Sequence, residues 1–400
     1  MNQTENAPRR IESVDALRGF AVMAIMFLHN IEHFNFYVFP ENDPTWLARI
    51  NTGVWDTLFF LFAGKAYAIF ALLFGFSFYI QNKGQEDRGN HFRGRFAWRL
   101  VLLLGFGFLN AVFFPGDVLV LYAIVGFSLI PVCKWSNKQL LALAIVFMLQ
   151  PVEWGKVIYA MQHPDWAGAT SRASYYFGQV YPALYGDSFI ETVKANFYDG
   201  QMASITWGWE NGRFFQTSAL FMLGLLIGRK SLFKINEESR RFWIKALIVA
   251  AVVVYPLYWF KDNTALFAEG AAQLKALNVI ALSWRNFASM VILVSLFMLA
   301  FSYVKTRNAL EVFVPYGKMS LTNYITQSIV GSVIYYGYGF AMYQHLGITL
   351  SFLTGVVLFI AQLQWCKWWL ARHQQGPLEY VWKKATWMRF GKEETQTSNI

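Results

Sequence analysis

Residues 14–33 read VDALRGFAVMAIMFLHNIEH, and this stretch determines the class of fold. An unbroken apolar run from Phe20 to Leu28 lies between polar groups at both ends. A bilayer core about 30 Å thick needs about 20 residues of helix, and fewer where side chains at the ends reach water. The stretch therefore predicts that a helix over residues 16–34 crosses a membrane.

The composition of the whole chain agrees with a membrane protein. Hydrophobic residues make up 56% of the 400 residues. Charged residues make up only 14%, whereas about 25% is usual in soluble domains. Both cysteines, Cys133 and Cys366, lie in apolar stretches, so no disulfide framework is indicated. We predict an all-α, polytopic membrane bundle that forms one domain over residues 1–400.

The chain has ten apolar stretches that match the length of a membrane span. Gly64 and Lys65 interrupt the second stretch, which indicates a break or a partly re-entrant helix there. The ten predicted spans are 16–34, 55–80, 98–114, 118–133, 139–159, 214–230, 244–260, 286–304, 319–340 and 346–370.

The distribution of charge predicts how these spans are oriented. With a cytoplasmic N-terminus, six segments lie inside, and they hold 25 of the 34 Lys and Arg residues and 11 of the 24 acidic ones. The net charge of +10 thus divides into +14 inside and −4 outside, as the positive-inside rule expects. We therefore predict cytoplasmic termini and a bacterial inner-membrane protein whose partner is the bilayer rather than nucleic acid. A homo-oligomer is compatible with the sequence.

Two segments that lie mostly outside the spans stand out. Residues 153–213 form a long connection on the outer side that is rich in Trp and Tyr. It is either a pair of interfacial amphipathic helices or a lid and aromatic platform over a site for a polar, sugar-like acceptor. Residues 371–400 are predicted to form a cytoplasmic tail.

The polar residues of the first span are the main candidates for function, because ionisable groups in hydrocarbon are costly and usually face an interior. Arg18 and His29 lie eleven residues apart, which on a helix places them about 20° apart and about 16 Å along the axis. An arginine can hold a phosphate or carboxylate, and a histidine can take a proton from an attacking hydroxyl or amine. In the alternative interpretation, Asp15 and Arg18 form an interfacial ion pair and His29 only bonds neighbouring helices.

Further ionisable residues occupy unusual positions. Lys65, Asp117 and Arg99 lie within or beside predicted spans, and Arg93 and Arg99 belong to a basic cluster that either anchors the topology or admits a phosphate. His29 to His33 also match the H-x-x-E-H pattern of inverted zinc peptidases, although no third ligand is identified. We predict no metal site.

Several blocks of this sequence resemble the YeiB family of bacterial multi-span proteins, a domain of unknown function. The last large block adds Asn323 to the candidate substrate-binding residues. The blocks are RIESVDALRGF at 10–20, Gly64-Lys65 with LLFG at 72–75, PGDVL at 115–119 with Tyr122, GKMSLTNY at 317–324 with Gln327-Ser328, and GPLEYVWK at 376–383.

The opening block is also similar to the start of the transmembrane acyltransferase superfamily, which includes the acyltransferase-three proteins and heparan glucosaminide acetyltransferase. In the acyltransferase-three branch an arginine, ten residues and a catalytic histidine form the motif, and Arg18 and His29 have that spacing. The resemblance implies that Arg18 orients an acyl-CoA donor, such as acetyl-CoA, and that His29 is the general base. Many YeiB-type members have an apolar residue in place of His29 and keep the next asparagine, so Asn30 and Asp15 join the candidate catalytic residues.

The resemblance implies transfer of an acyl group from cytoplasmic acyl-CoA to a hydroxyl or amine of a carbohydrate or envelope metabolite. A transporter of a small metabolite is the alternative, because Arg18, His29, Lys65 and Asp117 would serve equally well as intramembrane substrate or proton sites.

Overall fold

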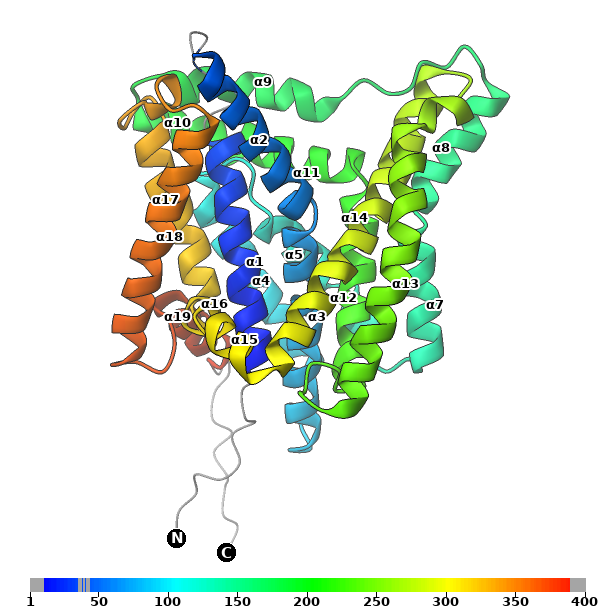
Figure 1. Ribbon diagram of the computed structural model, residues 1–400, viewed down its shortest axis with the longest axis vertical. Helices are drawn as coiled ribbons and strands as arrows, with labels where there is room; N and C mark the ends of the chain where they lie inside the picture. The colour runs from blue at the N-terminus through cyan, green and yellow to red at the C-terminus, as the bar shows by residue number, and fades with distance from the viewer. Residues whose placement is uncertain (1–10, 35–37, 39, 41–43, 389–400) are drawn as a thin grey trace, which may run out of the picture.

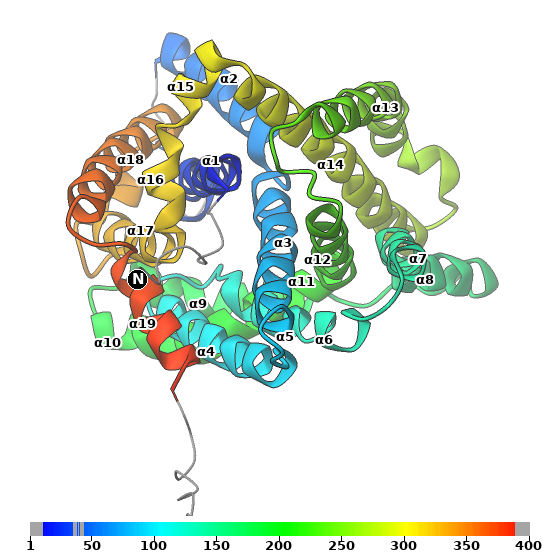
Figure 2. The ribbon, with the colours of Figure 1, turned by 90° about the horizontal axis from the view of Figure 1, so that it is seen from below.

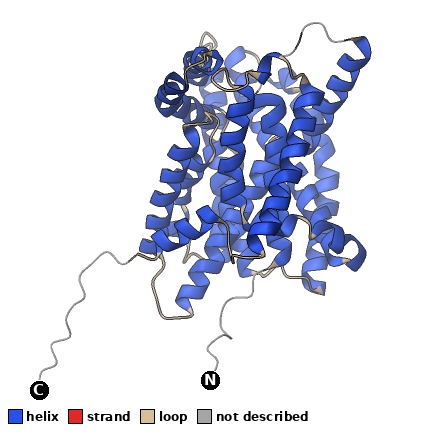
Figure 3. Cartoon of the chain, turned by 90° about the vertical axis from the view of Figure 1, so that its left-hand side faces the viewer, coloured by secondary structure: helices blue, strands red, loops and turns tan. Residues whose placement is uncertain are grey.

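The computed structural model describes residues 11–34, 38, 40 and 44–388, and every regular element within them is helical. Helices running up and down form a bundle, and shorter helices lie across its ends (Figures 1 and 3). The longer helices are α1 (Glu12–Leu28), α2 (Thr45–Phe62), α3 (Ala66–Glu86), α4 (Arg93–Ala111), α12 (Arg213–Arg229), α13 (Glu237–Asp262), α14 (Ala271–Ser302), α17 (Ser320–Tyr335) and α18 (Ile348–Leu370).

Five segments are long and apolar enough to cross a membrane: Glu12–Glu32, Thr45–Glu86, α13, α14 and α18. A sixth is formed if α7 (Asn137–Met148) and α8 (Pro151–Gln162), which meet at 45°, count as one broken span. An all-helical, multi-pass architecture is therefore supported. The count of ten spans stays a prediction, because the other predicted spans fall on shorter or more polar helices.

Helix α1 lies inside the bundle, surrounded by α2, α3, α16 (Phe313–Lys318), α17 and α18 (Figure 2). Of the apolar stretch in Glu12–Glu32, 89% of the residues are buried, as expected for a helix that is apolar on all sides. A Cβ added to Gly317 would lie 1.8 Å from the Asp15 carbonyl oxygen, and one added to Gly19 would lie 2.2 Å from that of Phe313. Glycines on both helices thus allow α1 and α16 to touch backbone to backbone.

The second predicted span is broken, as the sequence indicated. Helix α2 ends at Phe62, α3 begins at Ala66, and Gly64 between them has a φ of +73°. A Cβ at Gly64 would also lie 2.1 Å from the side chain of Asn286 on α14. Both the backbone angle and the lack of space require glycine at this break.

Several predicted boundaries differ from the structure. Helix α14 begins at Ala271 rather than at 286, so the segment before the predicted span is helical. Residues 305–318, which connect the predicted spans 286–304 and 319–340, fold into α15 (Val304–Leu310) and α16, because α16 can pack against α1. The predicted tail 371–400 contains α19 (Pro377–Thr386), which packs against α4 and α17.

The aromatic-rich segment 153–213 is mostly helical. Its first ten residues continue α8, and the rest contains α9 (Arg172–Tyr185), α10 (Phe189–Ala195) and α11 (Gln201–Glu210). Helix α9 runs across the end of the bundle, and α11 lies beneath it (Figure 1). The Glu210 carboxylate accepts hydrogen bonds from the Ser171 hydroxyl and from the backbone N–H groups of Arg172 and Ala173, so α11 holds the start of α9.

Candidate functional site

Asp15 and Arg18 form an ion pair near the start of α1. The Nη1 atom of Arg18 lies 2.9 Å from Oδ1 of Asp15, and its Nη2 donates to the Ser77 hydroxyl of α3 at 3.0 Å. Arg99 of α4 is near enough for its positive charge to interact with that of Arg18. This inner group thus combines two guanidinium groups with one carboxylate, an excess of positive charge suited to a phosphate.

The basic cluster on α4 is held by the C-terminal helix. The Arg99 guanidinium stacks 3.6 Å from the ring centre of Trp382 on α19, and the Trp382 indole donates to the Arg99 carbonyl. Arg95 donates to the carbonyl oxygens of Thr386 and Met388. Arg93 is exposed. Of this cluster, the structure therefore places only Arg99 beside Arg18.

His29 lies at the other end of α1, where the helix widens into a π-helical turn, His29–His33. The residue is 8% exposed, and the centre of its ring lies 4.6 Å from that of Phe114 and 6.1 Å from that of Tyr324 on α17. Arg18 and His29 therefore occupy opposite ends of one buried helix. The imidazole is enclosed by the aromatic rings of Phe34, Phe114 and Tyr324.

Asn30 faces a different neighbour from His29. Its Nδ2 donates to the Met26 carbonyl at 2.8 Å. The Asn30 side chain packs against Gly355 of α18, where an added Cβ would lie 3.3 Å from Nδ2. The Asn30 Oδ1 atom is buried without a hydrogen-bond partner. The structure thus places Asn30 at the same level as His29 but against α18.

Asp117 lies in the turn between α4 and α5 (Leu119–Gly126), close to Tyr324. Its carboxylate accepts hydrogen bonds from Nδ2 of Asn110 and from the backbone N–H of Val120, each at 2.9 Å. No ion pair of Asp117 is found among the described residues. Burial raises the pKa of the Asp117 carboxyl to about 7, against the lowering effect of these donors. The Tyr324 hydroxyl accepts from the backbone N–H of Val118 at 3.4 Å, so it connects this turn to the His29 ring.

Lys65 lies apart from both groups, at the break between α2 and α3. It is 2% exposed, and its Nζ donates to the Phe59 carbonyl in the last turn of α2, where a cation is favoured by the helix dipole. Arg285 of α14 is close enough for the two charges to interact. Neither cation pairs with a carboxylate among the residues that the structure describes.

Asn323 is occupied in helix packing. Its Nδ2 donates to the Tyr316 carbonyl of α16 at 3.0 Å and contacts the Cys366 sulfur of α18 at 3.2 Å. Its Oδ1 accepts from the Cys366 thiol. The structure thus places Asn323 at the junction of α16, α17 and α18, away from the turn that holds Asp117.

Arg213, which the sequence analysis passed over, is a further buried cation. It is 9% exposed, lies over the rings of Tyr67 and Trp207, and donates to Oε1 of Gln216, while its Nε has no hydrogen-bond partner. The Tyr67 hydroxyl also donates to Gln216. An arginine at the start of a predicted span is usually interpreted as a topological anchor. The only sequence signal that Arg213 points inward is the pair of polar residues in the next turn, Gln216 and Thr217.

No three His, Cys, Asp or Glu side chains gather closely enough to hold a metal ion within the described part of the chain. The zinc-peptidase pattern depends on His33, whose side chain lies outside the described residues.

Two protein families match separate parts of the chain. Residues 10–182 match the family described as heparan-alpha-glucosaminide N-acetyltransferase, catalytic, which suggests a transmembrane acetyltransferase-like fold. Residues 227–389 match a protein family of unknown function, DUF418. The first match includes all candidate residues except Asn323.

Relatives of similar length match nearly the whole chain. The uncharacterized protein YxaH of Bacillus subtilis is 26% identical to this chain. The aligned region covers 94% of YxaH and 95% of this chain. The uncharacterized protein YeiB of Escherichia coli is 25% identical to this chain. The aligned region covers 98% of YeiB and 96% of this chain. No solved structure matches the chain. The resemblance to the YeiB-type family, with its link to membrane acetyltransferases, is therefore confirmed.

Proposed function

We propose that this protein transfers an acyl group, most simply acetyl, from acyl-CoA to a hydroxyl or amine of a small carbohydrate or envelope metabolite. The observation that carries the proposal is the buried His29 imidazole enclosed by Phe114 and Tyr324, within the region that matches an acetyltransferase catalytic family. A histidine in such a setting can act as a general base near neutral pH.

In the proposed reaction, His29 takes the proton from the acceptor hydroxyl or amine as its oxygen or nitrogen attacks the thioester carbonyl. The carbon–sulfur bond breaks, and His29 returns the proton to the departing thiolate. The Tyr324 ring beside His29 limits the position of the imidazole, and the Tyr324 hydroxyl accepts from the backbone of the turn that holds Asp117. Asn30, with its free Oδ1, is the candidate for orienting a polar acceptor group from the side of α18.

The donor would be held at the inner end of α1. Arg18 and Arg99 provide the charge for a phosphate of acyl-CoA, because Asp15 offsets only one of them. The separation of this inner group from His29 along α1 suits a donor that enters from the cytoplasmic side and reacts deeper in the bundle. The acceptor would come from the far side, beneath α9 and α11.

The test uses the protein in nanodiscs with labelled acetyl-CoA and either glucosamine or an extract of envelope metabolites. We expect acceptor-dependent release of CoA, which His29→Ala lowers at least 100-fold. His163→Ala, at an exposed histidine in the outer segment, is the matched control and keeps full activity. Unchanged turnover in His29→Ala, with an intact thermal unfolding transition, would sink the role of His29.

A transporter is the second candidate, and the broken α2–α3 segment with buried Lys65 favours it, because discontinuous helices often form substrate sites in transporters. Acetyl-CoA separates the two functions. Thermal stabilisation by acetyl-CoA that is lost in Arg18→Ala supports the enzyme. Uptake of metabolites into proteoliposomes without CoA release supports the transporter.

A further inference from the structure

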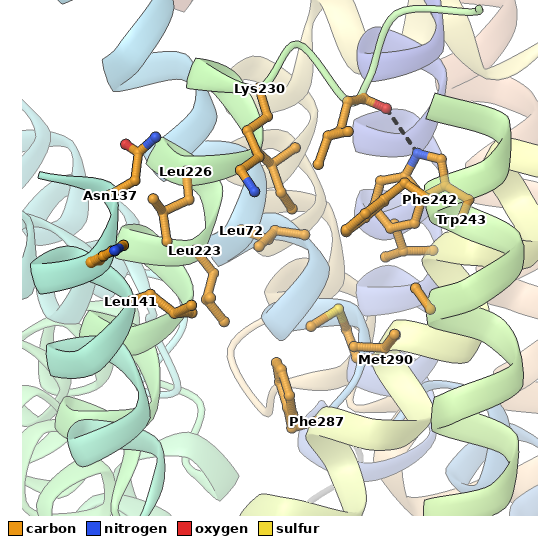
Figure 4. A pocket seen from close by; sticks show the side chains of 16 residues that line it. Leu72, Asn137, Leu141, Leu223, Leu226, Lys230, Phe242, Trp243, Phe287 and Met290 are labelled. Carbon is orange, nitrogen blue, oxygen red and sulfur yellow. Dashed lines mark hydrogen bonds between the residues drawn. The ribbon is translucent and has the colours of Figure 1, made fainter. Parts of the chain in front are cut away.

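A cavity of about 370 Å³ lies in the half of the bundle that does not contain α1. Helices α7, α12, α13 and α14 enclose it, and Leu72 of α3 contributes one wall. Away from Lys230 its lining is apolar and includes Leu141, Met290 and Phe287 (Figure 4). A cavity of this size and lining is in the range that holds a small molecule or one lipid chain.

One end of the cavity is basic. Lys138, Lys230 and Asn137 belong to its lining, and no acidic residue does. Figure 4 shows Lys230 and Asn137 at the same end, opposite Leu141, Met290 and Phe287. Neither lysine forms an ion pair with another described residue. The cavity is therefore complementary in charge and polarity to an amphiphile with an anionic head and an apolar tail.

The loop over this basic end is fixed in place. The Trp243 indole donates to the Leu232 carbonyl at 2.8 Å, the bond drawn in Figure 4. Arg229 donates to the carbonyl oxygens of Trp135 and Cys133, which ties the end of α12 to the start of α7. Lys138 and Lys230 thus belong to two chain segments that hydrogen bonds hold in place, which limits where their amines can lie.

The surroundings of the cavity are those of a lipid contact. Only 11% of the apolar stretch of α13 is buried within the protein, and Leu141 on α7 is 45% exposed. By contrast, α3 and α12 pack against each other between the cavity and α1 (Figure 2). Gly75 of α3 lies against the backbone of Phe221, and Gly224 of α12 lies against the backbone of Leu72. The cavity is therefore open to the bilayer and separate from the proposed acyl-transfer site.

We propose that this cavity binds an anionic phospholipid of the leaflet at the N-terminal end of α1. One acyl chain lies between α7, α12, α13 and α14, and the phosphate pairs with Lys138 and Lys230. The site goes beyond the proposed acyl transfer, since its residues take no part in that reaction. A phosphate–lysine pair near the membrane surface combined with a buried chain gives selectivity for anionic over zwitterionic lipid.

The test is native mass spectrometry of the protein equilibrated with phosphatidylglycerol or phosphatidylcholine of the same chain length. We expect one tightly retained phosphatidylglycerol and at least tenfold weaker retention of phosphatidylcholine. Lys138→Gln with Lys230→Gln should remove this preference, and Ala246→Phe, which fills the lining, should reduce retention of both lipids. Lys134→Gln with Lys234→Gln, at nearby exposed lysines outside the lining, should leave the preference unchanged.

Three results would overturn the site. The first is equal retention of both lipids by the unaltered protein, and the second is an unchanged preference in Lys138→Gln with Lys230→Gln. The third is displacement of the lipid by millimolar inorganic phosphate, because a lipid whose chain fills the cavity should stay bound when phosphate occupies the lysines. The thermal unfolding midpoint of each variant shows that it is folded. CoA release, measured separately, shows whether the acyl-transfer proposal holds, so the two can fail independently.

Discussion

At the scale of the residue, Asp117 makes stability depend on pH. Its pKa is raised by burial to about 7 in the folded protein, whereas an unfolded aspartate titrates near 4. Between these values the unfolded chain has released the proton and the folded one has kept it, so stability is greatest below about pH 4 and falls until about pH 7. We expect Asp117→Asn to remove the contribution of this carboxyl to the fall in the free energy of unfolding, which is on the order of 1 kcal/mol per pH unit.

Thermal unfolding of both proteins from pH 4 to 8 measures the effect. An asparagine can still accept from the Val120 N–H, and it can donate to the otherwise unpaired Oδ1 of Asn110, so the turn should keep its structure. If the unfolding midpoints of the two proteins run parallel across this range, the Asp117 carboxyl is already ionised in the folded state.

At the scale of the element, close contact between helices depends on glycine. A Cβ at Gly75 of α3 would lie 1.9 Å from the Phe221 carbonyl oxygen of α12, and one at Gly224 would lie 2.0 Å from that of Leu72. We expect Gly75→Ala to push α3 and α12 apart and lower the free energy of unfolding by about 1–3 kcal/mol. Gly105→Ala is the control, because nothing lies within 4 Å of its Cβ, and alanine should stabilise α4 by about 1 kcal/mol.

Chemical or thermal unfolding in one detergent compares the two glycine variants directly. Equal midpoints for Gly75→Ala and Gly105→Ala would mean that α3 and α12 do not approach as closely as the structure has them.

At the scale of the whole molecule, the C-terminal helix ties the two halves of the chain together. The Glu379 carboxylate of α19 accepts hydrogen bonds from the backbone N–H groups of Leu321 and Thr322 and from the Thr322 hydroxyl, so it caps α17. The Trp98 indole of α4 donates to the Ala385 carbonyl of the same helix. We expect Glu379→Gln to weaken this docking by about 1–3 kcal/mol.

Limited trypsin digestion measures the docking, because cleavage after Lys383 or Lys384 requires α19 to open. The cleavage rate should rise about tenfold or more in Glu379→Gln and stay unchanged in Glu238→Gln, at an exposed glutamate of α13. A rate equal to that of the unaltered protein would show that Glu379 does not hold the helix.

Several features of the fold and the candidate site follow from local sequence. The apolar run after Arg18 predicts a helix that crosses the membrane, and Gly64-Lys65 predicts the break, because glycine adopts the positive φ found there without steric cost. The pairing of Asp15 with Arg18 follows from their spacing of three residues. Where two residues lie on one helix, the helical repeat determines how far apart they are and whether they share a face.

Relations between distant segments were not predictable in this way. Nothing in the pattern around residues 305–318 showed that α16 would lie against α1, and a charged run such as 93–99 reads the same whether it is free or covered by Trp382. In an apolar chain, every face of a helix is hydrophobic, so periodicity does not single out the face that meets a partner.

The sequence by itself determined that the chain is helical and apolar enough for a membrane, that Arg18 and His29 share one helix, and that the second span is interrupted. The tertiary structure alone decided that His29 meets Phe114 and Tyr324, that Asn323 is used in packing, and that Arg213 is buried. The reason is physical: the first set depends on backbone geometry and transfer to lipid, which act locally. The second set depends on which helices can approach, and this is decided by small residues and shape across the whole bundle.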